Sequence, residues 1–180
     1  VIQLLPIYDT TQTSTWTDCY PYNAISIYAL HPLYLNLRDL PRIADEAYMQ
    51  MYHQEKDILN GLPLLDYERA LNLKLHYLHR LYEQEGTAVL ASAQCKEFIA
   101  KNQDWLLAYS VFCHRRDEEH TSYFPSWSIL SEYDEKQVHE YAAQRKEQVG
   151  FYIFVQYLLS AQLGEVTAYA RSKGVLLKGD

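Results

Sequence analysis

Two carboxylates, Asp18 and Asp180, have the residue type and the position in the chain that suit binding or catalytic chemistry. Each follows an apolar run that predicts a buried strand, residues 1–7 for Asp18 and residues 175–177 for Asp180. If the two strands are parallel neighbours, both carboxylates point toward the edge of the sheet at which such folds carry their binding groups. The alternative is that each aspartate caps a turn, since Asp side chains readily accept hydrogen bonds from loop backbone.

The other chemistry-bearing patterns favour structural roles. His76 and His79 lie three residues apart, a spacing that can reach a metal ion, but no acidic residues are patterned beside them to complete a site. The acidic residues 117–119 follow two arginines and are typical of a charged helix end. No phosphate-binding loop, zinc-protease motif, nucleophile elbow or Cys-x-x-Cys occurs. The sequence therefore predicts no metal site and no nucleophile paired with a base.

Composition limits the class of partner. The net charge of −7 argues against nucleic acid and against anionic membrane surfaces. No apolar run approaches the roughly 20 residues needed to span a bilayer. The cysteines (Cys19, Cys95 and Cys113) lack metal-ligand spacing and favour a reducing compartment. The 17 tyrosines suit sugar-binding surfaces, because the ring stacks and the hydroxyl bonds, although packing between helices is the more common reason for them.

Strand patterns occur at both ends of the sequence. Residues 1–7 form an almost continuous apolar run, typical of a strand buried on both faces. From Gly150 to about residue 172, apolar residues recur at three- and four-residue spacing and predict a long helix, which Gly174 ends in the left-handed conformation. Residues 175–177 follow as the second strand, the order expected for the second half of a β-α-β unit. Because both ends lie in or beside a strand, we expect a segment of a larger protein.

The residues between the strands are predicted to be a long loop followed by helices. Residues 8–22 have no helical or strand period, and an ordered loop of that length is usually functional. Asp66 is a suitable N-cap for one helix, and Gly86 is expected to end it. Helices are expected over residues 41–60, 66–86, 88–102, 103–116 and 134–148; residues 23–30 are a short helix or irregular, 33–37 extended, and 120–133 a loop.

A parallel crossover needs only about a dozen residues, far fewer than separate these two strands. The residues between the strands that a crossover does not need predict a helical subdomain, inserted between neighbouring strands of a sheet or barrel.

Several stretches resemble a known enzyme family. They are VIQLLPIYDT (1–10), DCYPYN (18–23) with the run to Leu37, WLLAYSVFCHRR (105–116), and residues 152–180 with KGD at their end. Their order and spacing are similar to those of the amylomaltases, the 4-alpha-glucanotransferases of glycoside hydrolase family 77, in the long form of plant cytosol and some bacteria. The matching stretches cover roughly half of the chain.

The resemblance implies a (β/α)8 TIM-type barrel with helical insertions, so the chain is expected to be mainly α. Residues 1–40 would be a barrel strand with its substrate loop, 41–148 the helical insertion subdomain, and 149–180 a barrel helix with the following strand, parallel to the first. Family members transfer α-1,4-glucosyl units between maltooligosaccharides by a retaining mechanism that uses three carboxylates. None of these matches a residue here, so the resemblance implies no catalytic residue within the chain.

The resemblance does imply substrate-binding residues within this chain. Tyr22 matches the family's sugar-contacting tyrosine, Asp180 matches the aspartate of a Gly-Asp strand end that contacts the glucan, and Asp18 matches the acidic residue that opens the loop motif. Cys19 stands where shorter members have serine, and Tyr20 is an additional residue of this loop. The implied partners are maltooligosaccharides, α-glucans and the rest of the same barrel, without cofactor or metal and in a cytoplasmic location.

Two alternatives remain open. The chain could be a non-catalytic helical binding or scaffold segment of an inactive barrel, because it contains no catalytic set. It could also belong to an α-glucan hydrolase of the same fold, which differs only in whether water or a sugar attacks the glycosyl enzyme.

Overall fold

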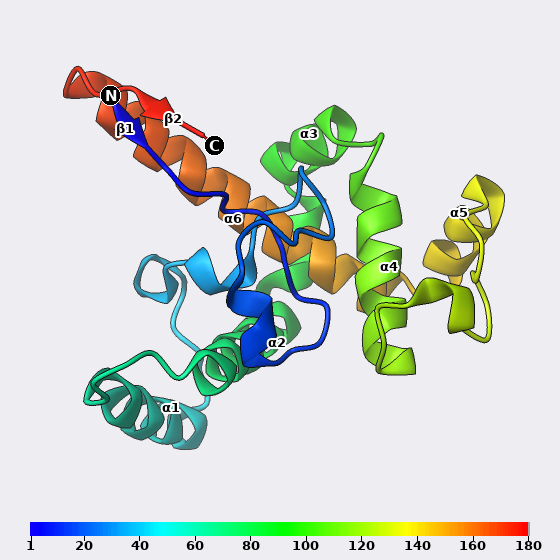
Figure 1. Cartoon of the computed structure of the whole chain (residues 1–180). Helices are drawn as coiled ribbons and strands as arrows, with labels where there is room; N and C mark the ends of the chain where they lie inside the picture. The colour runs from blue at the N-terminus through cyan, green and yellow to red at the C-terminus, as the bar shows by residue number, and fades with distance from the viewer. Residues whose placement is uncertain (180) are drawn as a thin grey trace.

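The computed structural model describes residues 1–179, and most of its regular structure is helical (Figure 1). These residues form six α-helices, two short β-strands and four short 3-10 helices. In chain order the elements are β1 (Ile2–Gln3), η1 (Trp16–Cys19), η2 (Pro32–Tyr34), η3 (Leu37–Asp39), α1 (Glu46–Asn60), α2 (Tyr67–Ala91), α3 (Ala93–Lys101), α4 (Leu106–Glu119), η4 (Phe124–Ser126), α5 (Glu135–Gln144), α6 (Lys146–Ser172) and β2 (Leu177–Lys178). The expectation of a mainly helical chain is confirmed.

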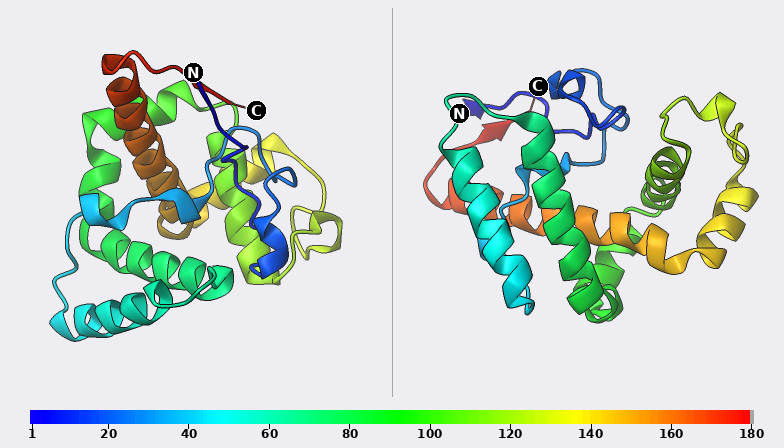
Figure 2. Two further views of the ribbon diagram at one scale, coloured as in Figure 1. Left: turned by 60° about the vertical axis from the view of Figure 1, so that its left-hand side comes forward. Right: turned by 90° about the horizontal axis from the view of Figure 1, so that it is seen from below.

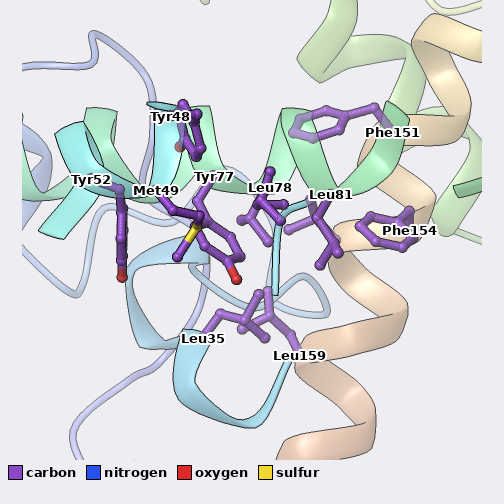
Figure 3. Packing of buried hydrophobic residues seen from close by; sticks show 12 residues of the cluster. Leu35, Tyr48, Met49, Tyr52, Tyr77, Leu78, Leu81, Phe151, Phe154 and Leu159 are labelled. Atoms are coloured by element: carbon purple, nitrogen blue, oxygen red, sulfur yellow. The ribbon is translucent and has the colours of Figure 1, made fainter. Parts of the chain in front are cut away.

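Helix α6 is the central element of the fold. α2 and α4 pack against it, and α3 and α5 also contact it (Figures 1 and 2). Its predicted apolar face is confirmed, because Phe151, Phe154 and Leu159 are at most 4% exposed. Burial of each such side chain stabilises the fold by about 1.5–3 kcal/mol. Figure 3 shows the cluster that they form with α1, α2 and the segment before α1; its labelled members are Leu35, Tyr48, Met49, Tyr52, Tyr77, Leu78, Leu81, Phe151, Phe154 and Leu159.

This cluster joins residues from all three predicted parts of the chain, with Leu35 from the first, α1 and α2 from the second, and α6 from the third. The division into residues 1–40, 41–148 and 149–180 stays a prediction. No helix among residues 1–179 combines the length and the apolar character needed to cross a membrane.

The predicted parallel pairing of the two end strands is confirmed. β1 lies beside β2, with Ile2 opposite Leu177 and Gln3 opposite Lys178, and the Ile2 amide donates to the Leu176 carbonyl at 2.8 Å (Figure 1). Gly174 ends α6 with φ at 69°, as its sequence position predicts.

The paired strands are shorter than the predicted runs, and the expectation of burial on both faces is wrong for the described chain. Val1 is 85% exposed and Leu5 is 64% exposed. β1 has one neighbouring strand within residues 1–179, and most of the surface of these two side chains is exposed.

Gly86 does not end a helix, contrary to the sequence prediction. α2 continues through it to Ala91, and Ser92 makes the break by capping α3, where its hydroxyl accepts from the Cys95 amide at 3.2 Å. The ring of Tyr82 lies over Gly86 so closely that a Cβ atom there would overlap it. Gly86 thus serves side-chain packing between α2 and α6, where the Tyr82 hydroxyl donates to the Glu147 carbonyl at 2.9 Å.

We expect Gly86→Ala to lower the free energy of unfolding of the full-length protein by about 1–3 kcal/mol, since it overpacks a filled site. This loss should exceed the gain of about 1 kcal/mol that alanine brings through helix propensity. Gly164 is the matched control, because it also lies inside a helix but, its own helix backbone apart, no atom of residues 1–179 lies within 4 Å of an added Cβ. Gly164→Ala should raise stability in the same urea titration. Equal stabilisation by both changes would contradict the packing role of Gly86.

Other helix ends differ from the predictions because a capping residue sets where the helix begins. The first predicted helix begins at Glu46, not near Pro41, because Asp45 accepts from the Tyr48 amide at 3.0 Å. The Asp66 cap is confirmed by its 3.1 Å bond from the Arg69 amide. Within residues 33–37 only Leu35 and Asn36 are extended, because η2 and η3 take up the residues on either side, and residues 23–30 are irregular. Helices α3, α4 and α5 occupy the remaining predicted helical segments with shifted ends.

The core tyrosines predict loss of stability at alkaline pH. Burial raises the pKa of Tyr52 and Tyr77, and raises the pKa of Tyr48 to about 12. The unfolded chain loses these protons near pH 10, so their contribution is complete below pH 10 and is lost as the pH rises toward 12. A pH titration of tyrosinate absorbance in the full-length protein should therefore show exposed tyrosines ionising first, and the buried set only as the fold is lost.

Tyr48→Phe tests this directly, since the Tyr48 hydroxyl is buried without a hydrogen-bond partner among the described residues. The change should move the alkaline unfolding midpoint upward. Ionisation of every tyrosine near pH 10 with the helical signal intact would contradict the prediction.

Candidate functional site

The predicted loop over residues 8–22 is confirmed. It is part of a longer irregular segment, residues 8–30, which we call the first loop and whose two ends are hydrogen-bonded to each other. Tyr8 forms an antiparallel bridge with Leu30, and the His31 amide donates to the Ile7 carbonyl at 3.0 Å. The Asp9 amide also donates to the Ala29 carbonyl at 2.8 Å. These bonds close the base of a loop that lies near α2 and α4 (Figure 1).

A buried polar network anchors this loop to α4. Asp9 is 1% exposed, and its carboxylate accepts from the Thr11 amide at 2.9 Å, the Thr11 hydroxyl at 2.7 Å and the Tyr109 hydroxyl at 2.5 Å. Arg116 donates to the Thr11 carbonyl at 2.5 Å and to its hydroxyl oxygen at 2.7 Å. Burial and the charge of Asp9 raise the pKa of Tyr109 well above its usual value, so this phenol remains a proton donor. Two residues of α4 thus hold the first turn of the loop.

Helix α6 holds the other end of the loop through Gln156, which is 2% exposed. Its side-chain oxygen accepts from the Leu30 amide at 2.8 Å, and its nitrogen donates to the Leu30 carbonyl at 2.8 Å. The same nitrogen lies 3.2 Å from the Tyr109 hydroxyl and so joins this contact to the Asp9 network. Both ends of the loop therefore depend on the packing of α4 against α6.

Asp18 points into the loop. It is 5% exposed, and its carboxylate accepts from the Ser14 amide at 2.7 Å, the Thr13 amide at 3.0 Å and the Thr13 hydroxyl at 2.9 Å. Ser14 has φ at 58°, a left-handed conformation that these bonds help to hold. The contacts are those of the turn-capping alternative, and a role for Asp18 in binding substrate stays a prediction.

Tyr22 points outward from the same loop and is 55% exposed. Its ring centre lies 5.6 Å from that of Tyr20, which is 62% exposed, and Trp16 and Tyr28 are exposed as well. The loop therefore presents several aromatic rings to solvent. Asp180, the third predicted residue, lies outside the described residues.

The sequence reasoning did not identify Asp9, Tyr109, Arg116 or Gln156. Arg116 lies in the last turn of α4, as the prediction of a charged helix end requires, but the sequence did not show that it is buried. One signal was present, because Tyr109, Cys113 and Arg116 recur at helical spacing and so place polar atoms on a buried face of α4.

His79, one of the two histidines of the predicted pair, packs against an aromatic ring of α6. The ring of His79 stacks on Phe151 with centres 3.7 Å apart, and desolvation of the ring lowers the pKa of this histidine, although the residue as a whole is exposed. Within residues 1–179, no group of three or more His, Cys, Asp or Glu side chains is arranged to hold a metal ion.

Comparison with known proteins places these features in a family. A family model described as 4-alpha-glucanotransferase matches residues 1–180. The chain is 36% identical over 183 residues to a 4-alpha-glucanotransferase of Oryza sativa subsp. japonica, an alignment that covers 100% of this chain and 19% of the relative. It is 32% identical over 182 residues to the 4-alpha-glucanotransferase of Chlamydia caviae, with coverage of 100% and 33%. The corresponding enzyme of Synechocystis is 26% identical over 165 residues, with coverage of 89% and 32%.

The chain thus spans a third or less of the length of these relatives. Because the family model matches the chain from end to end, the chain belongs to glycoside hydrolase family 77, the 4-alpha-glucanotransferases.

Proposed function

We propose that this chain is part of a 4-alpha-glucanotransferase that transfers α-1,4-glucosyl units between maltooligosaccharides or longer glucans. Its contribution is to bind substrate, while the carboxylates of a retaining mechanism lie outside the chain. The observation that carries the proposal is the aromatic loop after β1, which presents Tyr22 to solvent and is held at both ends by buried polar contacts. The family's cytoplasmic location is part of the same proposal.

The two strands are proposed to be neighbours in a (β/α)8 barrel, with the helices from α1 to α5 as an insertion between them. Their parallel pairing supports this arrangement. Exposed apolar side chains on these end segments, such as Val1, Leu5 and Leu176, are suited to contact further barrel strands. In such barrels the loops after the strands form the active site, which is the position of the Tyr22 loop after β1 and of Asp180 after β2.

Each proposed substrate-binding residue has a different task. The Tyr22 ring stacks on the flat C–H face of a glucose unit, and Asp180 accepts hydrogen bonds from glucan hydroxyls. Asp18 fixes the shape of the loop that presents Tyr22, since its carboxylate is bonded to Thr13 and Ser14. These tasks require no metal ion or organic cofactor.

The test is a reaction of the full-length protein with maltotriose, in which both the sugar sizes and the total reducing ends are followed. Redistribution into shorter and longer glucans at constant reducing ends is the expected result. A steady rise in reducing ends would mean that water is the acceptor and that the protein is a hydrolase of the same fold. No change with any glucan would favour the scaffold alternative.

A further inference from the structure

A concave surface with a basic lining lies between α1, α2 and the segment before α1. We call it the basic groove. It encloses about 530 Å³, within the range of about 300–1,000 Å³ that is usual for small-molecule sites. Two of its walls are α1 and α2, which lie side by side (Figure 2). Four of its lining residues, Leu35, Met49, Tyr52 and Tyr77, are labelled in Figure 3.

The charged side chains that line the basic groove all carry one sign. Its basic lining residues, which come from the segment before α1, from α1 and from α2, are Arg38, Arg42, His53, Lys56 and Lys74. No aspartate or glutamate of residues 1–179 is among its lining residues. Arg42 is paired with Glu46, but Arg38 and Lys56 form no ion pair or side-chain hydrogen bond within residues 1–179. The groove is therefore a positive region in a chain whose net charge is −7.

Lys74 is held in the basic groove as a cation without a counter-ion. Its ammonium donates to the Leu33 carbonyl and, at 2.7 Å, to the Leu35 carbonyl, and these bonds leave its third proton without a partner within residues 1–179. Desolvation lowers the pKa of Lys74 to about 8, and no carboxylate of the described chain offsets this effect. A partly buried cation costs solvation free energy unless an opposite charge compensates it. A bound anion would supply that charge.

We propose that the basic groove binds a small organic phosphate, a phosphate monoester with an apolar body. A phosphate monoester carries a charge of about −2, which three cations without carboxylate partners (Arg38, Lys56 and Lys74) can neutralise. The Arg38 guanidinium can also bond two phosphate oxygens at once. Half-buried leucines of the same lining offer an apolar surface for the body of the ligand, namely Leu37, Leu40, Leu59 and Leu73.

Other anionic partners match the basic groove less well. A carboxylate brings a single charge to three cations and has one oxygen fewer to accept their hydrogen bonds. Nucleic acid and anionic membranes contact broad surfaces, and the net charge of −7 opposes both of them. A small concave site with a local excess of cations favours a small, doubly charged ligand. Such a ligand would bind whether or not the protein transfers glucosyl units.

The experiment is isothermal titration calorimetry of the full-length protein with phenyl phosphate near neutral pH. Arg38→Gln/Lys56→Gln should raise the dissociation constant about tenfold or more, because two charge-assisted contacts are lost. Arg38 is exposed and Lys56 half-buried, and neither side chain bonds within residues 1–179, so the fold should persist. Inorganic phosphate, which lacks the apolar body, should bind about tenfold more weakly than phenyl phosphate.

Lys96→Gln/Lys146→Gln is the matched control. It removes the same charge from two exposed lysines that do not line the basic groove and form no ion pair within residues 1–179. Its affinity for phenyl phosphate should equal that of the wild type. Equal weakening in the two double variants would overturn the proposal, because the attraction would then be general and not local.

Three further results would overturn the proposal. The first is no binding of phenyl phosphate at millimolar concentration, and the second is equal affinity for benzoate or for inorganic phosphate. The third is displacement of phenyl phosphate by maltotriose, which would place the ligand on the substrate surface. Failure of the proposed function remains distinguishable, because an inactive protein whose binding is weakened only by Arg38→Gln/Lys56→Gln still supports the organic phosphate site.

Discussion

Arg116→Met is expected to lower the free energy of unfolding of the full-length protein by about 3–5 kcal/mol, the usual cost of removing one partner from a buried charged network. Arg116 is 8% exposed. Without it, the Thr11 carbonyl loses its donor and the buried carboxylate of Asp9 loses a nearby positive charge. Urea unfolding followed by helical circular dichroism gives the difference.

Arg42→Met is the matched control for this prediction. Arg42 pairs with Glu46 at 2.6 Å, but both side chains are more than half exposed and the pair is screened by solvent, so its loss should leave the stability almost unchanged. The double variant Asp9→Asn/Arg116→Met should lose less unfolding free energy than the two single variants lose in sum, because the two groups belong to one network. Equal, small effects of Arg116→Met and Arg42→Met would refute the anchoring role of Arg116.

Tyr22→Ala is expected to lower kcat/KM for maltotriose transfer by about tenfold or more, which corresponds to about 1.4 kcal/mol or more of lost interaction. The physical reason is loss of a stacking surface for a glucose ring. Because the side chain is 55% exposed, the fold and its unfolding midpoint should be little changed. The measurement is the initial rate of glucose release from maltotriose by the full-length protein.

Tyr22→Phe separates stacking from hydrogen bonding, since it keeps the ring and removes the hydroxyl. It should retain most of the activity if stacking dominates. Tyr123→Ala, which removes an exposed tyrosine outside the loop, should behave as wild type. Kinetics of Tyr22→Ala close to those of the wild type would remove Tyr22 from the proposed substrate-binding residues.

Arg116 and Tyr22 contribute to the same loop in different ways. Arg116 acts through the Asp9 network, which holds the backbone, whereas Tyr22 stands on the surface of that loop. The conservative variant Arg116→Lys should keep part of the stability. If the network also positions Tyr22, this variant should still lose transfer activity, because lysine cannot make both of the bonds that Arg116 makes to Thr11. Its kcat/KM, compared at a temperature where it is fully folded, reports this positioning role.

Local sequence patterns were sufficient for the features that depend on neighbouring residues. The apolar face of α6 was predictable because residues three and four apart share a side of a helix, and the Asp66 cap because it bonds an amide three residues away. The left-handed Gly174 follows from glycine's freedom from Cβ contacts. The first loop was recognised by its lack of any period, and the family by the order of its motifs.

Side-chain packing and hydrogen bonding in the folded chain decided the features that the sequence reasoning missed. Gly86 was expected to end a helix, but the Tyr82 ring occupies the space beside it and extends to α6. The strands were expected to be buried on both faces, but burial depends on neighbours elsewhere in the fold. Asp18 was placed on the correct loop, but only the folded loop shows that its carboxylate turns inward to Thr13 and Ser14.

The sequence by itself thus determined the helices, the loop that bears Tyr22 and the family to which the chain belongs. Only the tertiary structure decided what holds that loop. Arg116 and Thr11 are 105 positions apart, and Asp9 and Tyr109 are 100 positions apart, so no local period links them. They meet because the packing of α4 and α6 excludes water from the base of the loop, and polar groups buried there must bond to one another.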